Sequence, residues 1–89
     1  MAAFAIISQV PNPALQARIM ETYPNAFHVV SPSIAWLVAA NGVTTQEVST
    51  ALTIMPGGID GAIVLKIDSY YGFASKAVWE WLAVKATET

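Results

Sequence analysis

The stretch Gly61–Leu82, GAIVLKIDSYYGFASKAVWEWL, holds the pattern that decides the fold. From Ile63 to Asp68 apolar residues occupy every second position, which is the period of a β-strand with one fully apolar face. A turn over Tyr70–Phe73 follows, where Gly72 permits a positive φ. The stretch therefore predicts a strand, a turn and then a helix.

The helix expected after this turn is unusually apolar. Ser75 can serve as its N-cap. At about 100° per residue its apolar side chains cover an arc of roughly 160°, with Glu80 on the opposite side. These side chains are Val78, Trp79, Trp81 and Leu82. Because that arc is wider than one small sheet needs, we expect part of it to meet a second subunit.

The chain is short, apolar and poor in charge. Its 89 residues make a single domain, 1–89, without a stretch that resembles a linker. Hydrophobic residues make up 55% and charged residues 11%, against a typical charged share of about 25%. A domain of this size cannot hide so many apolar side chains. We therefore expect a homo-oligomer, with a dimer favoured, ahead of docking on a partner protein or a hydrophobic ligand site.

Charge and targeting signals narrow the function classes. The net charge is −2, and the four basic residues are scattered, which disfavours binding to a nucleic-acid backbone unless assembly gathers them. The chain has no cysteine, so it has no disulfide framework and no thiolate chemistry. Its first apolar run stops at Ser8 and is too short for a signal peptide or a membrane span. We expect a cytoplasmic protein with no membrane partner.

The first half of the chain predicts a strand followed by a helix. Phe4–Val10 is apolar on both faces at its start, which is typical of a strand in the middle of a sheet. Asn12 and Pro13 supply an N-cap and a first helical residue. The helix ends before Pro24, and its apolar stripe comprises Leu15, Ile19 and Tyr23, with Met20 beside them.

Two further strands and a second helix follow. Ala26–Val30 and Ile34–Ala40 flank a turn and are expected to pair antiparallel. Thr44 and Glu47 have the spacing of a capping box, so a short helix begins there. Its expected buried stripe is Val48, Ala51 and Leu52. The segment 55–61 is rich in glycine and is predicted to be a loop.

This order of elements predicts an α+β fold, the ferredoxin-like βαββαβ arrangement with an additional C-terminal helix. Right-handed crossovers place the first two helices on one face of a four-stranded antiparallel sheet, with the first and third strands central. The other face needs a cover, which the last helix or a second copy of the sheet would provide. A different mixed sheet made of the same elements is the alternative.

Several short motifs resemble a known family. They are the opening FAIISQVPNP, the Trp36–Val38 strand, the Thr-capped helix, and an apolar strand leading through Tyr70–Gly72 to Trp79–Leu82. Together they look like the short SinR-like proteins, which are ferredoxin-like relatives of the small CRISPR-associated adaptation nucleases. The resemblance spans most of the chain and implies a small dimeric sheet protein.

The same resemblance argues against the nuclease chemistry. In the nuclease relatives an aspartate at the end of the first strand holds a divalent metal, and its symmetry mate lies across the dimer interface. The matching position here is Gln9, preceded by Ser8. A neutral amide does not supply the charge that attracts a hard cation. We therefore expect no metal, no cofactor and no catalytic residue, and we expect the scaffold without hydrolysis.

Few other polar residues suggest a site. His28 is the only histidine and is interpreted as an ordinary, partly exposed side chain, with a site role as the alternative. Asp60 and Asp68 lie on either side of the last strand and are interpreted as solvated carboxylates. The glycine-rich loop lacks the lysine of a P-loop and precedes a strand, so turn formation explains it better than phosphate binding. The serines have no convincing His and Asp partners.

Aromatic residues are the remaining candidates for a ligand or interface site. Aromatic side chains stack on bases, and they also pack the centres of cores and protein interfaces. Without basic residues around them, core or interface is the favoured interpretation and nucleotide stacking the weaker one. The candidates are Trp36, Tyr70, Tyr71, Phe73, Trp79 and Trp81.

The sequence thus favours a non-catalytic, homo-oligomeric binding and assembly domain. Its interface is expected to use Trp79 or Trp81 together with the exposed face of the sheet. Two alternatives stay open. One is a small binder of nucleotides or nucleic acid, from a phage or a defence system. The other is a metal-dependent nuclease with relocated ligands, which would need acidic residues that converge across an interface. Apart from these readings, Gln9, His28 and Asp68 are the candidates for a polar site.

Overall fold

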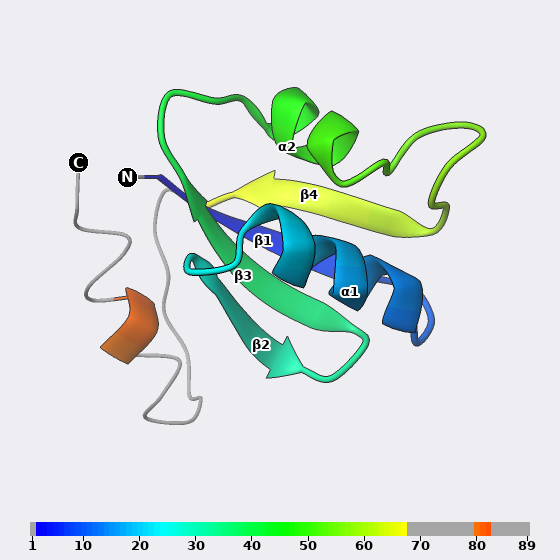
Figure 1. The fold of residues 1–89 in the computed structure, drawn as a ribbon, viewed down its shortest axis with the longest axis horizontal. Coiled ribbons are helices and arrows are strands. Elements are labelled where there is room, and N and C mark those ends of the chain that lie inside the picture. The colour runs from blue at the N-terminus through cyan, green and yellow to red at the C-terminus, as the bar shows by residue number, and fades with distance from the viewer. Residues whose placement is uncertain (1, 68–79, 83–89) are drawn as a thin grey trace.

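The chain folds into a four-stranded antiparallel sheet with two helices on one face (Figure 1). The computed structural model describes residues 2–67 and 80–82. The strand order β2-β3-β1-β4 confirms the predicted ferredoxin-like arrangement with the first and third strands central. The elements are β1 (Ala2–Ser8), α1 (Pro13–Thr22), β2 (Phe27–Ser31), β3 (Ala35–Ala40), α2 (Thr45–Ala51) and β4 (Ala62–Lys66).

Helix α1 begins and ends where its sequence predicts. The Asn12 side chain accepts a hydrogen bond from the Leu15 N–H at 3.0 Å, and a proline opens the first turn. Leu15 and Ile19 are fully buried, while Met20 lies 46% exposed outside the buried stripe. Tyr23 caps the C-terminal end, and partial burial raises the pKa of its phenol.

Helix α2 carries the predicted capping box. The Thr44 hydroxyl accepts from the Glu47 N–H at 3.1 Å, and the Glu47 carboxylate accepts from the Thr44 N–H at 3.0 Å. Val48 and Leu52 then point into the core and are buried. The box thus fixes the start of α2 at the position that brings its apolar stripe onto the sheet.

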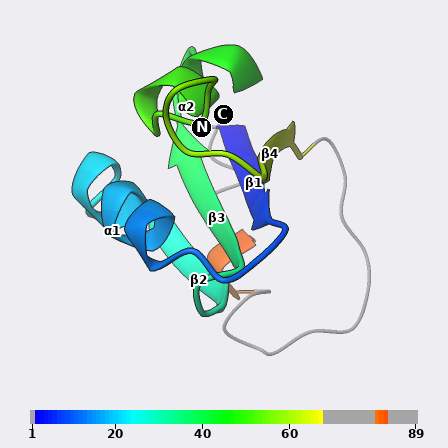
Figure 2. The same cartoon turned by 90° about the vertical axis from the view of Figure 1, so that its right-hand side faces the viewer.

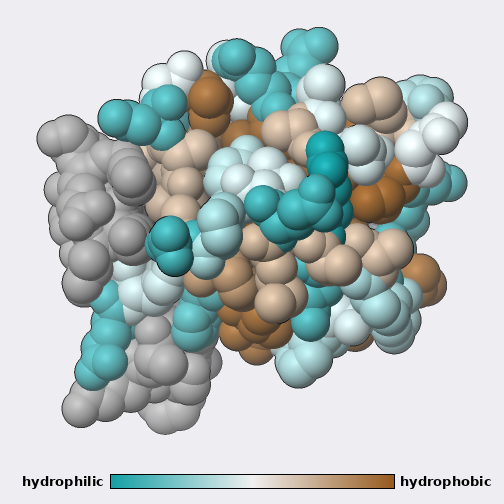
Figure 3. All heavy atoms as spheres, in the orientation of Figure 1, coloured by the Kyte–Doolittle hydropathy of each residue, from teal (hydrophilic) through white to brown (hydrophobic). Residues whose placement is uncertain are grey.

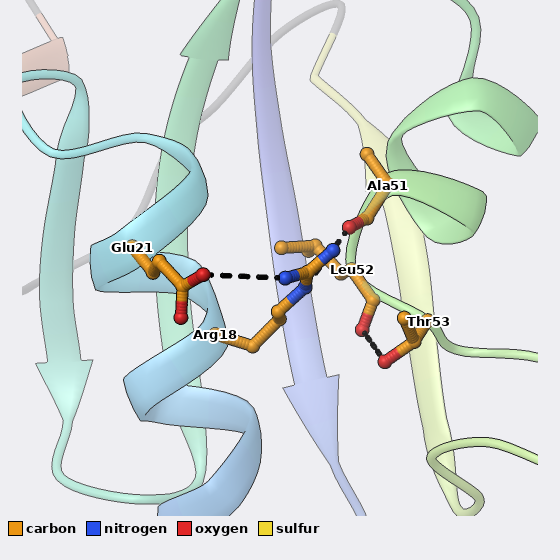
Figure 4. Close-up of polar contacts among 5 residues, drawn as sticks. All are labelled: Arg18, Glu21, Ala51, Leu52 and Thr53. Atoms are coloured by element: carbon orange, nitrogen blue, oxygen red, sulfur yellow. Dashed lines mark hydrogen bonds and ion pairs between the residues drawn. The ribbon is translucent and has the colours of Figure 1, made fainter.

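Arg18 ties the two helices together (Figure 4). Its Nε donates to the Ala51 carbonyl at 3.2 Å, and its Nη1 lies 3.5 Å from the Glu21 carboxylate. The last carbonyls of a helix lack partners within the helix and favour a cation beside them. Arg18 of α1 therefore caps the C-terminal end of α2, a contact that the sequence pattern does not predict.

The main core lies between the sheet and the helices. It is a single cluster of side chains that are all at most 1% exposed: Phe4, Ile6, Leu15, Ile19, Trp36, Val38, Val48 and Leu52. The strand residues in this cluster share one face of β1 and β3, because Phe4 pairs with Val38 and Ile6 with Trp36. This face is called the helix face below.

The predicted C-terminal helix is only partly within the described residues. Residues 80–82 are helical, and the rest of its expected span lies outside them. Figure 2 shows α1 and α2 on one side of the sheet and residues 80–82 on the other. Within the described ranges, no helix has both the length and the apolar character needed to cross a membrane.

Candidate functional site

The second face of the sheet, opposite the helices, is the strongest candidate for a functional surface. We call it the open face. By strand alternation and register it carries the side chains of Ala3, Ala5, Ile7, His28, Ala35, Leu37, Ala39, Ile63 and Leu65. None of these side chains is a carboxylate, an ammonium or a guanidinium. The open face is therefore almost entirely apolar.

Large apolar side chains on one half of the open face are left in water. Ile7 is 42% exposed, Ile63 52% and Leu65 44%. Ile7 pairs with Ile63 across β1 and β4, and Ala5 pairs with Leu65, so these residues are contiguous. We call Ala5, Ile7, Ile63 and Leu65 the apolar stripe. Contiguous exposed apolar side chains on a sheet are typical of interaction surfaces.

The other half of the open face is covered. The Trp81 ring lies against His28 of β2, with 6.2 Å between ring centroids and 37° between ring planes. Leu37 and Ala39 of β3 are 6% and 3% exposed, and Leu82 of the same helical turn as Trp81 is 5% exposed. The cover over β2 and β3 thus stops short of the apolar stripe on β1 and β4.

The helix-bearing side has a different surface character. Figure 3 looks onto this side, where hydrophilic and apolar side chains are interspersed. Within α1 and α2, Met20 is the one large apolar side chain that is exposed, at 46%, and Met55 after α2 is 39% exposed. Isolated apolar side chains of this kind are normal on a soluble surface. The open face differs from the helix side because its exposed apolar side chains are contiguous.

Gln9 lies just beyond the end of β1. Its side chain is exposed, and its backbone N–H donates to the Gly61 carbonyl at 2.7 Å. Together with Asp60 it borders a shallow hollow beside Ile7 and Ile63. The Asp60 carboxylate accepts from the Gly61 N–H at 2.8 Å. Gln9 and Asp60 are thus polar neighbours of the apolar stripe.

Metal-binding groups do not gather in the described ranges. Residues 2–67 and 80–82 contain no group of at least three His, Cys, Asp or Glu side chains that could hold an ion. His28, a candidate from the sequence, instead contacts the Trp81 ring. Asp68, the other acidic candidate, lies outside the described residues.

The glycine-rich segment forms a turn, as its sequence predicts. The Gly58 N–H donates to the Met55 carbonyl at 2.9 Å, and the Ile59 N–H donates to the Thr53 carbonyl at 2.7 Å. A Cβ atom at residue 58 would collide with the backbone oxygen of Thr53. Glycine is therefore needed at this position for the close approach of two backbone segments.

The aromatic candidates separate in the structure. Trp36 points to the helix face and is 1% exposed, so its ring is part of the core and not of a surface. Trp81 is half-buried on the open face. The other candidates lie outside the described residues: Tyr70, Tyr71, Phe73 and Trp79.

Gln16 explains why a tryptophan is tolerated at position 36. Its Oε1 accepts from the Trp36 Nε1–H at 3.0 Å and from the Ser33 N–H at 2.8 Å. Ser33 has a positive φ of 64° in the turn between β2 and β3. One amide of α1 thus satisfies a buried indole and fixes this turn. Sequence reasoning missed it, because the three residues meet only in the folded chain.

Replacing Gln16 by Ala is expected to lower the free energy of unfolding by about 1–3 kcal/mol, because it leaves the buried indole N–H without a partner. Urea denaturation at fixed protein concentration measures the loss. The loss should shrink in a Trp36→Phe background, which has no indole N–H. Equal losses in both backgrounds would contradict a role through Trp36.

Comparison with known proteins adds no relative. No family model, curated protein or solved structure matches this chain. The resemblance to the SinR-like family therefore stays a prediction.

Proposed function

We propose that this protein is a non-catalytic assembly domain that packs the apolar stripe of its open face against a second copy of itself. The single observation that carries this proposal is the contiguous exposure of Ile7, Ile63 and Leu65 on the sheet face away from the helices. Two sheets pack readily through such faces at a separation of about 10 Å. Their burial removes apolar surface from water, which is the main driving force for association.

The charge distribution supports a second copy as the occupant. A two-fold contact brings the same patch of both subunits together, and residues near the axis meet their own copies, so a charge there would face a like charge. The apolar stripe contains no charged residue. The overall composition, with 55% hydrophobic and 11% charged residues, points the same way. A two-fold contact needs an uncharged, apolar surface that can pack against its own copy.

The covered half of the open face sets the limit of the proposed interface. The Trp81 ring lies against His28 of β2 and is half-buried, so in the proposed contact, centred on β1 and β4, its exposed part would form the rim. The proposal keeps the expectation that Trp81 takes part. A cytoplasmic location, in keeping with the lack of cysteine, belongs to the same proposal.

Sedimentation equilibrium of the full chain at micromolar concentration tests the proposal. The mass is expected to be a multiple of the 9.5 kDa of one chain. A compact monomer across the whole concentration range would overturn it. The nucleotide-binding and nuclease alternatives stay predictions. Within the described residues, no group of His, Cys, Asp or Glu side chains that could hold a metal ion supports the nuclease alternative.

A further inference from the structure

Within the part of the chain that the structure describes, strand β4 forms one edge of the sheet and pairs with β1 alone. Its orientation follows from two hydrogen bonds at the ends of this pairing. The Gln9 N–H donates to Gly61, and the Ile67 N–H donates to Ala3. In an antiparallel pair the hydrogen-bonded positions recur every second residue. The backbone groups of Ile63 and Leu65 therefore face β1.

The alternate residues of β4 face outward. Ala62, Val64 and Lys66 direct their N–H and C=O groups away from β1, along the edge of the sheet. Among residues 2–67 and 80–82, no hydrogen bond reaches these outward groups. Unpaired edge groups of this kind are a template for another strand. Figure 2 shows β4 at this border of the sheet.

We infer that β4 of a second copy pairs antiparallel with this edge, centred on Val64. Val64 then lies opposite the partner's Val64, and Ala62 lies opposite the partner's Lys66. The outward groups of both strands are satisfied by about six backbone hydrogen bonds. The two four-stranded sheets become one continuous sheet.

The residues of β4 fit a copy of themselves in this register. Ile63 lies opposite the partner's Leu65 at a position without hydrogen bonds, where side chains approach most closely. Lys66 faces a small neutral residue, so the two ammonium groups stay at opposite ends of the paired strands. The apolar stripe of one copy also continues directly into that of the other. A self-complementary strand favours a second copy over an unrelated peptide.

This edge contact goes beyond the face-to-face contact proposed above and uses different atoms. Its two-fold axis is normal to the sheet, whereas the axis of the face contact lies parallel to the sheet. Perpendicular two-fold axes that intersect generate a closed assembly of four copies. With both contacts present, the expected assembly is a tetramer. With the edge contact alone, it is a dimer.

The substitution Lys66→Pro tests the edge contact in the full chain. Proline removes the outward N–H and fills the edge with its ring, but it leaves the hydrogen bonds between β4 and β1 intact. Lys66→Ala is the matched control, because it removes the same charge and keeps the N–H. Sedimentation equilibrium should show half the wild-type mass for Lys66→Pro and the wild-type mass for Lys66→Ala.

Amide hydrogen exchange of the wild-type protein gives a second measurement that does not depend on how the proline variant folds. Paired edges protect the N–H groups of Ala62, Val64 and Lys66 as well as those of Ile63 and Leu65. We expect the three outward amides to exchange at least about tenfold more slowly at high than at low protein concentration. Fast outward amides beside slow inward amides at all concentrations would overturn the inference.

The outcomes separate the two contacts. An oligomer whose mass is unchanged by Lys66→Pro, with fast outward amides, overturns the edge contact and leaves the face contact standing. A dimer that becomes a monomer in Lys66→Pro supports the edge contact and overturns the face contact. A wild-type monomer overturns both.

Discussion

Replacing Ile7 by Glu is expected to halve the mass of the assembled protein by removing the face-to-face contact. Ile7 is 42% exposed in the apolar stripe, on β1, which is one strand in from the β4 edge. A glutamate there would have to leave water in both copies and face its own symmetry mate. Burying an unpaired carboxylate costs several kcal/mol. Sedimentation equilibrium measures the mass.

Met20→Glu is the matched control for this experiment. Met20 is exposed to a similar extent, 46%, but it lies on the helix-bearing side. The same added charge should therefore leave the mass unchanged. The melting temperature should rise with protein concentration in the wild type, because association stabilises only the folded chain. An Ile7→Glu protein with the wild-type mass would contradict the proposed interface.

Replacing Trp36 by Ala is expected to give the largest loss of stability, about 3–5 kcal/mol in the free energy of unfolding. Trp36 is the largest side chain of the core and is 1% exposed. Its removal leaves a cavity beneath α1 and takes away one of the two hydrogen-bond donors to the Gln16 amide oxygen. Since small domains are stable by only about 5–15 kcal/mol, this loss would be a large share of the total.

Urea denaturation followed by circular dichroism, at one protein concentration, measures this effect. Trp36→Phe is expected to lose less, because the ring keeps most of the packing. Met20→Ala should lose less than about 1 kcal/mol at its exposed position. A loss below about 1 kcal/mol for Trp36→Ala would place position 36 outside the core.

Local signals in the sequence predict most of the fold. The Asn12 cap and the Thr44–Glu47 capping box fix both helix starts, because each cap is built from residues within three positions of one another. The alternation in β4 and the apolar run in β1 give two strands, and the handedness of crossovers gives their order. Strand ends differ by one or two residues, since Ala35 rather than Ile34 begins β3.

Contacts between distant parts of the chain, and the side of the sheet on which an aromatic residue lies, were less predictable. The hydrogen bonds from Ser33 and Trp36 to Gln16, and from Arg18 to Ala51, join residues far apart in the chain. Sequence periodicity relates only residues that are close together in the chain, so it cannot predict contacts between distant ones. The aromatic count made Trp36 and Trp81 look equivalent, whereas one lies in the core and the other on the open face.

The sequence by itself determined that a strand runs through Ile63–Lys66 and that Ile63 and Leu65 share one side of it, although its ends differ from those predicted. Only the tertiary structure decided that this more apolar side turns away from the helices, while Val64 packs against the core. Alternation with a period of two shows which side chains share a side of the strand, but it does not show which side faces the core and which faces water. The environment is set by the register with β1, which places Val64 beside Ile6 under the helices and Ile63 beside Ile7 in water.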